Sequence, residues 1–330
     1  MITIKNKWRP PGNVPAIRYL FCFFAVLICC VIAFLVGIVL FQDELPAPRF
    51  SGNDAFNEKA RWLKTNLTPK CDVLIIGSSI ALNNAAPEGF DLLYPGGTFI
   101  NAGFWGASSE DSARMLKEII PLCKPRMVLF LTYYGDFKTN DSEFYIKWDQ
   151  FAEYLKGESA LLAYLSNLDL SYYAKTFMEH HRIAKLGRGS YYCLQFNKYG
   201  SVNFDSARLK IEPARWNAYK TSRFIFSEVK PTMMNAVSDM ARTAHLNNSQ
   251  LVVVSTPMIH SAEDYIPTNE TSKLWEVVRK RVGGEGGIYL HVTSMDGFDD
   301  PLFADCAHLN QLGAKKLASE IVERIQQLPK

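Results

Sequence analysis

The apolar residues of this chain follow two different patterns. One uninterrupted run, from Tyr19 to Phe41, holds 23 residues without a charged side chain. As an α-helix this run would be roughly 34 Å long at about 1.5 Å per residue, which is enough to cross the hydrocarbon core of a bilayer. After it, short apolar runs alternate with mixed segments, which is typical of a globular domain. We therefore predict one transmembrane helix over residues 19–41.

A cleaved signal peptide is the competing interpretation of this run. The apolar region of such a peptide usually has about 7–15 residues and ends at a small-residue cleavage site. Here the run continues into Leu40-Phe41-Gln42-Asp43, which offers no such site. We favour a retained anchor, which makes the lipid bilayer a partner of residues 19–41.

The charges on the two sides of the run predict its orientation. The residues before it carry only positive charge and the residues after it begin with negative charge. The basic residues are Lys5, Lys7, Arg9 and Arg18, and the acidic ones are Asp43 and Glu44. By the positive-inside rule, residues 1–18 form a cytoplasmic tail. We expect a single-pass protein of the cell (inner) membrane whose main domain is periplasmic or extracellular.

Four compact apolar runs in the rest of the chain predict buried parallel strands. They are rich in β-branched residues and lie at 71–79, 126–134, 250–257 and, more weakly, 287–294. Between the first two runs, Ser109 or Glu110 could cap a helix, and after the last one apolar residues recur at helical spacing. These last residues are Ala314, Leu317, Ile321 and Ile325.

Strands that alternate with helices predict a three-layer α/β/α domain with a parallel sheet, of flavodoxin-like type, over residues 71–330. In such sheets the chemistry lies at the carboxyl ends of the strands. We expect residues 42–70 to be a tether and a leading helix at about Asp54–Asn66. The segment at about 137–235 breaks the alternation and is expected to be a partly helical insertion.

The insertion is rich in aromatic residues. They are Phe144, Tyr145, Trp148, Tyr154, Tyr172, Tyr173, Tyr191, Tyr192 and Trp216. Aromatic rings could stack on sugars or line an acyl pocket, or they could pack a small core within the insertion. We favour the packing role.

Charge and cysteine content narrow the classes of function. With 36 basic and 33 acidic residues the net charge is +3, which indicates no polycationic surface for nucleic acid. The cysteines lack the paired short spacings of a zinc site. Cys71 precedes the first predicted strand and Cys123 the second, so both thiols should lie near one sheet edge. A disulfide and two separate buried thiols are both compatible with this spacing.

Three separated segments carry candidate chemistry. Gly77-Ser78-Ser79 ends the first predicted strand and can present a hydroxyl at the rim of the sheet. The segment 101–109, NAGFWGASS, is a glycine-containing loop whose backbone N–H groups can approach an anion. Asp305 and His308 precede the last predicted helix, and such an Asp can hold the imidazole in the tautomer that accepts a proton from serine.

In their order and placement these segments resemble the SGNH (GDSL-type) hydrolase superfamily over about residues 72–326. That family has Gly-Asp-Ser in its first block, so the resemblance implies that Ser79 is the nucleophile, with Ser78 as the rival. It places the oxyanion-hole glycine on Gly106. The fifth block, Asp-x-x-His followed by Leu-Asn and a glycine, is matched at 305–313 and implies roles for Asp305 and His308.

The third block departs from the family pattern. Relatives with Gly-x-Asn-Asp have an oxyanion-donating asparagine there, whereas this chain has Gly135 within Tyr133-Tyr134-Gly135-Asp136. The loss of one oxyanion donor can cost on the order of 2.7–4 kcal/mol of transition-state stabilisation. Asn101 and Asn83 are the candidate replacements.

The resemblance implies acyl transfer through serine. His308 would take the proton of Ser79, Asp305 would orient the imidazole, and the N–H groups of Ser79 and Gly106 would bind the oxyanion. This chemistry calls for no metal and no cofactor. The other histidines show no comparable partners in the sequence and are expected to be structural or exposed. They are His180, His181, His245, His260 and His291.

A domain of this kind on a single anchor is similar to exported proteins that acylate cell-surface polymers. The resemblance therefore implies an O-acyltransferase or acetylesterase that acts on a polysaccharide, with a multi-spanning membrane O-acyltransferase as a partner. Two alternatives remain: a membrane-anchored lipase or thioesterase, and a non-catalytic scaffold that retains the fold.

Overall fold

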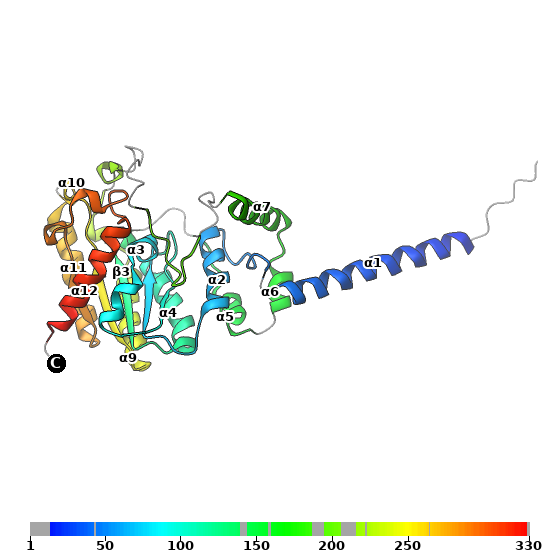
Figure 1. The fold of residues 1–330 in the computed structure, drawn as a ribbon, viewed down its shortest axis with the longest axis horizontal. Helices are drawn as coiled ribbons and strands as arrows, with labels where there is room; N and C mark the ends of the chain where they lie inside the picture. Colours follow the sequence, from blue (N-terminus) through cyan, green and yellow to red (C-terminus); the bar gives the residue numbers. More distant parts are fainter. Residues whose placement is uncertain are drawn as a thin grey trace, which may run out of the picture.

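A long N-terminal helix projects from a mixed α/β domain in the computed structural model of the chain (Figure 1). The structure describes residues 14–42, 44–138, 144–157, 160–186, 195–205, 216–221, 223–263 and 265–328. Helix α1 covers Val14–Phe41, and its part from Ala16 to Phe41 is apolar and long enough to span a bilayer. The basic residues Lys5, Lys7 and Arg9 and the acidic Asp43, on which the predicted orientation depends, lie outside the described residues.

The domain is built on one five-stranded parallel sheet with the order β2-β1-β3-β4-β5. The strands are β1 Val73–Gly77, β2 Phe99–Asn101, β3 Met127–Thr132, β4 Gln250–Ser255 and β5 Ile288–His291. All four predicted strands are present. The fifth, β2, was not predicted because it has only three residues and one of them is a buried asparagine.

Helices cover both faces of the sheet, as the α/β prediction requires. One layer contains α4 Ser109–Cys123, α9 Pro231–Leu246 and α11 Thr268–Gly284, which pack side by side. The other layer contains α3 Ser79–Asn84 and α12 Gln311–Gln326, which contact each other. The capping residue of α4 is Ser108, which directly precedes the predicted candidates Ser109 and Glu110. Helix α12 is the predicted closing helix.

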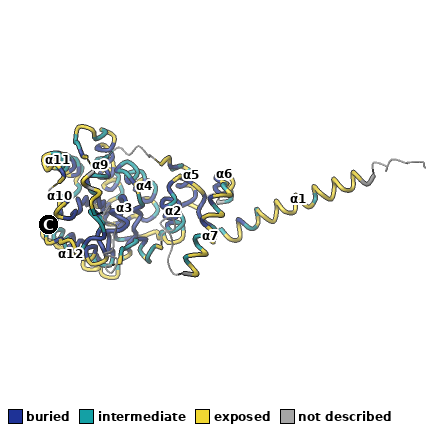
Figure 2. The backbone as a smooth tube through the Cα atoms, turned by 90° about the horizontal axis from the view of Figure 1, so that it is seen from above, coloured by how far each residue is buried: buried dark blue, intermediate teal, exposed yellow. Residues whose placement is uncertain are grey.

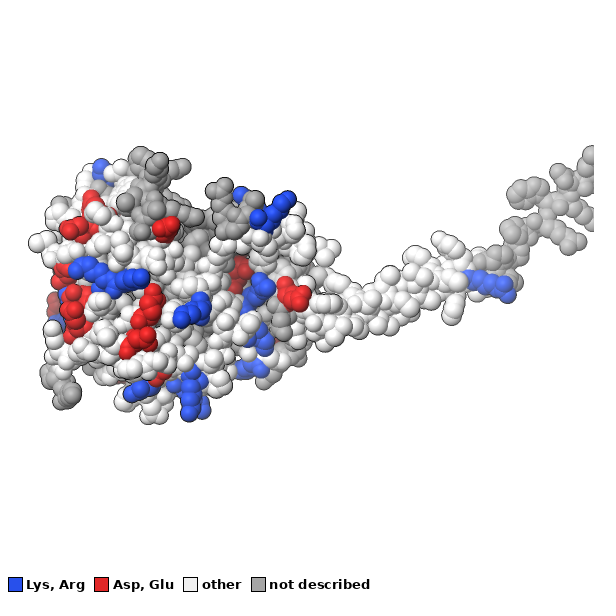
Figure 3. Space-filling view, viewed as in Figure 1, with Lys and Arg blue, Asp and Glu red and all other residues white. Residues whose placement is uncertain are grey.

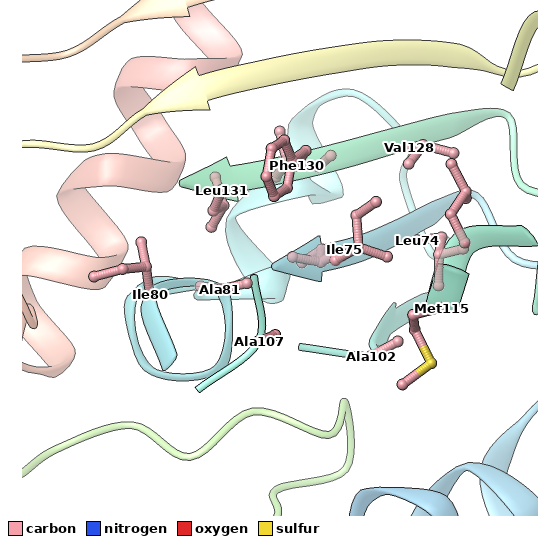
Figure 4. Close-up of a cluster of buried hydrophobic side chains, with 14 of the residues drawn as sticks. Leu74, Ile75, Ile80, Ala81, Ala102, Ala107, Met115, Val128, Phe130 and Leu131 are labelled. Atoms are coloured by element: carbon pink, nitrogen blue, oxygen red, sulfur yellow. The ribbon is translucent and has the colours of Figure 1, made fainter. Parts of the chain in front are cut away.

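The hydrophobic core lies between these layers, and it explains why the strands have no polar face. Every residue of β1 and β3 is buried, because helices cover both sides of a parallel sheet. Figure 4 shows Ile75 of β1 and Phe130 of β3 among this cluster, with Ile80 of α3 close by. The buried backbone forms the centre of the domain in Figure 2. This rigid sheet fixes the positions of the loops at its carboxyl edge.

A group of helices lies between the sheet and α1 (Figure 1). They are α2 Asp54–Asn66, α5 Trp148–Lys156, α6 Ala160–Ser166 and α7 Leu170–Leu186. The side chain of Asn53 caps α2 by accepting hydrogen bonds from the N–H groups of Ala55 and Phe56. Three of these helices come from the predicted insertion. The remaining short elements are α10 His260–Glu263 and the 3-10 helices Pro87–Leu92, Tyr134–Phe137, Ala218–Thr221, Phe226–Glu228, Ser294–Asp296 and Asp300–Leu302.

The aromatic residues of the insertion fall into a buried group and an exposed group. Tyr154 and Tyr172 are buried, and the Trp148 ring contacts Phe56 of α2. This is the packing role that the sequence favours. In contrast, Tyr145 is 79% exposed and lines a cavity. The residues Tyr191, Tyr192 and Cys193 lie outside the described part of the chain.

Cys71 and Cys123 lie together at one end of the sheet, as the spacing predicts. The N–H of Cys71 donates to the carbonyl of Cys123 at 2.9 Å, and both side chains are buried. The two thiols are free, so the candidate disulfide is not formed in the structure. A side-chain hydrogen bond with Cys123 and burial both raise the pKa of Cys71. This disfavours the thiolate that disulfide exchange requires.

Charged side chains of both signs are intermixed over the domain face in Figure 3, whereas α1 carries charge only near its N-terminal end. The domain therefore presents no face of a single sign in this view.

Candidate active site

A sharp turn at the end of β1 presents Ser79. Gly77 has φ +139°, and a Cβ atom there would collide with the carbonyl oxygen of Leu131, so this position requires glycine. Ser78 follows as the N-cap of α3, and its hydroxyl accepts a hydrogen bond from the N–H of Ile80 at 3.2 Å. Ser79 is the first residue of the helix and remains partly exposed at the carboxyl edge of the sheet.

The structure brings Ser79 together with the two residues that the fifth block supplies. The Nε2 atom of His308 lies 2.8 Å from the Ser79 Oγ atom. The Nδ1 atom of the same ring lies 2.8 and 2.9 Å from the two carboxylate oxygens of Asp305. Ser79 and His308 are 229 positions apart along the chain, so it is the fold that brings them together. The arrangement is that of a nucleophile, a base and a residue that orients the base.

Asp305 is held as a carboxylate by its own loop. Burial favours its neutral form, but hydrogen bonds from the His308 ring and from the N–H groups of Ala307 and His308 outweigh burial and lower the pKa of Asp305. A charged Asp305 requires a proton on Nδ1 of His308 for this contact. The Nε2 atom is then free to accept the proton of Ser79.

The other residues of the fifth block shape this loop. The Asn310 side chain caps α12 by accepting hydrogen bonds from the N–H groups of Leu312 and Gly313 at 3.0 and 3.1 Å. A Cβ atom at Gly313 would collide with the carbonyl oxygen of Leu302, so α12 can approach this loop only with glycine there. Leu309 is fully buried. The motif therefore combines two site residues with three that position the loop.

Asn84, which the sequence did not single out, links α3 to the same loop. Its amide nitrogen donates to the carbonyl of Ala307 at 3.1 Å, and its oxygen accepts from the N–H of Leu309 at 2.8 Å. The two bonds flank His308 on both sides, and Asn84 is fully buried. It is the last residue of α3, the helix that begins with Ser79, and the helical spacing between the two gives no signal for this contact.

The glycine loop after β2 runs beside α3. The N–H of Gly103 donates to the Asn101 side chain at 2.9 Å, and a Cβ atom at Gly103 would lie 2.8 Å from the Cβ of Ala81. Gly103 is thus used for close packing on α3. In contrast, neither the Gly106 N–H nor the Ser79 N–H donates a hydrogen bond to another described residue. Each of these two N–H groups can therefore donate a hydrogen bond to a bound molecule.

The two asparagines expected to replace the missing oxyanion donor are already engaged. The amide nitrogen of Asn101 donates to the carbonyl of Ala81 and to the hydroxyl of Ser201, at 2.8 and 2.9 Å, which uses both of its hydrogens. The Asn83 side chain donates to the carbonyl of Val202 and accepts from the Trp105 indole. Both asparagines are fully buried. In these contacts they hold loops together, and Asn101 has no hydrogen left for an oxyanion.

The Tyr133 ring determines which residue fits at position 135. A Cβ atom at Gly135 would collide with the Tyr133 ring, so the ring occupies the space that a side chain at 135 would need. The next residue, Asp136, is buried and accepts hydrogen bonds from the hydroxyls of Ser78 and Thr132. Burial raises the pKa of Asp136 to about 7, although these hydrogen bonds and His308 oppose the rise. Asp136 therefore connects Thr132 of β3 to Ser78, the residue before Ser79.

Three of the remaining histidines contact other polar side chains in the structure. His291 shares a hydrogen bond with the hydroxyl of Ser255, which lies directly opposite it in the register of β4 and β5, and Tyr289 donates to the same hydroxyl at 3.1 Å. His180 lies 3.1 Å from Glu58, and His260 lies 3.4 Å from the hydroxyl of Ser294. His291 is the last residue of β5, and its position at the end of a predicted strand is the signal in the sequence that could have pointed to it. Within the described residues, no group of three acidic, histidine or cysteine side chains gathers to hold a metal ion.

Two cavities lie near the carboxyl edge of the sheet. One of about 340 Å³ is lined by Gly106 and by Phe144, Trp148 and Met233, so it adjoins the predicted oxyanion loop. The other, of about 180 Å³, is lined by Tyr133, Trp275, Ser255 and His291 among others. The first combines aromatic rings with the polar side chains of Asn53, Lys138 and Glu110.

Comparison with known proteins gives a likeness to solved structures alone. No family model and no curated protein matches this chain. A solved structure that it resembles is the crystal structure of the lipase/acylhydrolase from Enterococcus faecalis, with 14% sequence identity and a TM-score of 0.38. The match covers 78% of this chain and 98% of that chain. A likeness this distant carries no argument about function, which therefore depends on the geometry of Ser79, His308 and Asp305.

Proposed function

We propose that this protein is a membrane-anchored, extracytoplasmic serine acyl-transfer enzyme of SGNH type. The observation that carries the proposal is the contact of 2.8 Å between Ser79 Oγ and His308 Nε2, with Asp305 on the other side of the ring. A structural serine has no need of a base that a partly buried carboxylate orients. The three residues together have the geometry that nucleophilic catalysis requires.

The proposed reaction is the transfer of an acyl group through Ser79. Its Oγ attacks an ester carbonyl while its proton passes to Nε2 of His308. The tetrahedral intermediate collapses, the alcohol leaves with the proton of His308, and the acyl group stays on Ser79. Water or a sugar hydroxyl then attacks the acyl-enzyme, again with His308 as the base.

The proposed oxyanion donors are the N–H groups of Ser79 and Gly106. Both keep their donor capacity among the described residues, whereas the Gly103 N–H is bound to Asn101. Without an asparagine at position 135, the hole has two backbone donors and no side-chain donor from the third block. Such a hole gives less stabilisation to the transition state of each acyl-transfer step, so we expect turnover of free esters to be slow.

A cell-surface polysaccharide is the proposed acceptor, and the reaction is O-acyl transfer or deacetylation. The apolar helix α1 supports an anchor that keeps the enzyme at a membrane, where a multi-spanning O-acyltransferase would supply the acyl group. The cavity beside Gly106 supports a sugar-binding role, because the exposed rings of Phe144 and Tyr145 accompany polar side chains there.

The proposal is tested by release of nitrophenol from an aryl acetate by the full-length protein in detergent. Wild type is compared with Ser79→Ala and with Ser319→Ala, an exposed serine of α12 that serves as the matched control. We expect turnover to be lost in Ser79→Ala and kept in the control, with unchanged circular dichroism in both. Equal turnover in wild type and Ser79→Ala would exclude the serine mechanism.

The same assay with an added oligosaccharide separates the two forms of the reaction. Acetylated sugar among the products, identified by mass, supports transfer, whereas acetate alone supports an esterase. A folded protein that shows neither product favours the scaffold alternative. Ser78→Ala tests the rival nucleophile and should keep turnover, because its hydroxyl is directed to the Ile80 N–H and Asp136.

A further inference from the structure

Helix α6 is the part of the domain on which the C-terminal end of α1 rests. The two helices pack against each other, and Ile38 of α1 is buried in the contact region. The hydroxyl of Tyr164 in α6 donates to the carbonyl of Gln42 at 3.1 Å, immediately after α1 ends. Figures 1 and 2 both show α6 and α7 at the end of the domain from which α1 emerges. The position of α6 is thus fixed relative to α1.

The surface around this contact is unusually apolar. Among the described residues after 44, thirteen large hydrophobic residues are exposed, and six of them fall within residues 162–178. They are Leu162, Leu165, Leu168, Leu170, Phe177 and Met178. The other seven are spread over more than two hundred residues. Contiguous exposed apolar residues on a soluble surface indicate a contact with a partner or a membrane.

We propose that this surface, formed by α6 and the first part of α7, lies on the lipid bilayer that α1 crosses. The inference rests on the proposed anchor. If a bilayer contains the span from Ala16 to Phe41, its surface lies near Phe41, and α6 is bound to the next residue, Gln42. The exposed leucines of α6 therefore lie at the depth where apolar side chains enter the boundary between headgroups and acyl chains.

The charges of α7 fit a lipid surface. This helix carries Lys175, Arg182 and Lys185 against one acidic residue, Glu179, which is paired with Arg182. Lys175 is paired with Asp54 of α2, so Lys185, which is exposed in the last turn of α7, is the basic residue of the three that is placed to meet lipid headgroups. Basic side chains beside an apolar face are typical of helices that lie in the membrane interface.

Such a contact would restrict how the domain turns about its anchor. A single transmembrane helix alone leaves the domain free to rotate, whereas a second contact on α6 and α7 fixes one side of it against the bilayer. The sheet lies on the far side of α2 and α5 from α1 (Figure 1). The candidate active site would then be held at a constant distance from the membrane surface.

The test is photocrosslinking of the full-length protein in nanodiscs of phosphatidylcholine and phosphatidylglycerol. p-Benzoylphenylalanine replaces Phe177, which is 67% exposed, and in a matched control it replaces Leu312 on α12, which is 55% exposed. A third variant carries it at Phe34, within α1. We expect a mass shift of one phospholipid at positions 177 and 34 and none at position 312.

The three positions separate this inference from the anchor. A lipid adduct at 34 without one at 177 overturns the proposed surface contact and leaves the anchor supported. No adduct at either position overturns both. In native membranes, an adduct of residue 177 with another protein in place of lipid would overturn the lipid contact in favour of a protein partner. Unchanged circular dichroism of the variants confirms that each retains the fold.

Discussion

The side-chain oxygen of Asn84 accepts a hydrogen bond from the N–H of Leu309 at 2.8 Å, across 225 positions of sequence. This bond and its companion to Ala307 join the helix that begins with Ser79 to the loop that carries His308. The distance between nucleophile and base is therefore set by a side chain that takes no part in the proposed chemistry. Its role is to position His308, and it can be tested separately from the reaction.

Asn84→Ala should lower kcat for aryl acetate hydrolysis while it changes KM little, because the substrate still binds but His308 is displaced. The buried Leu309 N–H loses its partner, which costs on the order of 1–3 kcal/mol of unfolding free energy. Asn84→Asp keeps the acceptor and should restore part of the activity. Asn66→Ala, on the exposed end of α2, is the control. Wild-type kcat in Asn84→Ala would show that the link does not position the base.

The strands and the order of the motifs could be predicted because their signals are local. The runs that became β1, β3 and β4 are almost continuously apolar, as strands buried on both faces of a parallel sheet must be. Such a sheet places both Ser79 and the Asp305 loop near its carboxyl edge. The pairing of Ser79 with His308 in particular was implied by the resemblance to the SGNH superfamily.

The side-chain network behind the site could not be predicted in the same way. Asn101 and Asn83 are buried near the candidate site. The Asn101 amide nevertheless donates to Ser201 and the Asn83 amide to Val202, in a loop that lies far along the chain. A sequence shows which residues can donate hydrogen bonds but not which acceptor each will meet. At position 135, likewise, the ring of Tyr133 leaves no room for a side chain. The orientation of that ring depends on the whole fold.

Asp305→Asn should reduce kcat by roughly 10⁴-fold, since an amide cannot hold His308 in the tautomer that accepts the serine proton. Asp300→Asn, an exposed acidic residue five positions earlier, is the control and should keep wild-type rates. The measurement is the rate of nitrophenol release at saturating substrate. If Asp305→Asn retains more than about one tenth of the rate, the orienting role assigned to Asp305 is wrong.

Asp136 predicts a pH dependence of stability. Burial raises its pKa in the folded protein to about 7 from an ordinary value of 3.8, so between these values the folded state binds a proton that the unfolded chain releases. The free energy of unfolding therefore falls as pH rises through this interval. The slope should differ from that of Asp136→Asn by about 1.4 kcal/mol per pH unit. Denaturant titrations in detergent at several pH values measure it, and parallel slopes would refute the assignment.

The free thiols of Cys71 and Cys123 predict a labelling pattern. In the folded protein both should resist iodoacetamide at neutral pH, because burial and their mutual contact keep Cys71 protonated. After denaturation without reductant, Cys71, Cys123, Cys193 and Cys306 should all be alkylated. Peptide mass spectrometry gives the labelled fraction at each position. Loss of label at Cys71 and Cys123 together, restored by reductant, would show that they are bridged.

Gly135→Asn tests why the third block lacks its asparagine. The new Cβ atom would collide with the Tyr133 ring, so the variant should lose on the order of 1–3 kcal/mol of unfolding free energy and gain no hydrolysis. Gly283→Asn, where the structure places no atom near the glycine, is the control for stability. Removing the ring should reverse the outcome: Tyr133→Ala with Gly135→Asn should hydrolyse aryl acetate faster than Tyr133→Ala alone, because a side-chain donor then has room beside the nucleophile. Faster hydrolysis by Gly135→Asn alone would mean that Tyr133 is not the obstacle. The slow hydrolysis proposed for the native site would then need another cause.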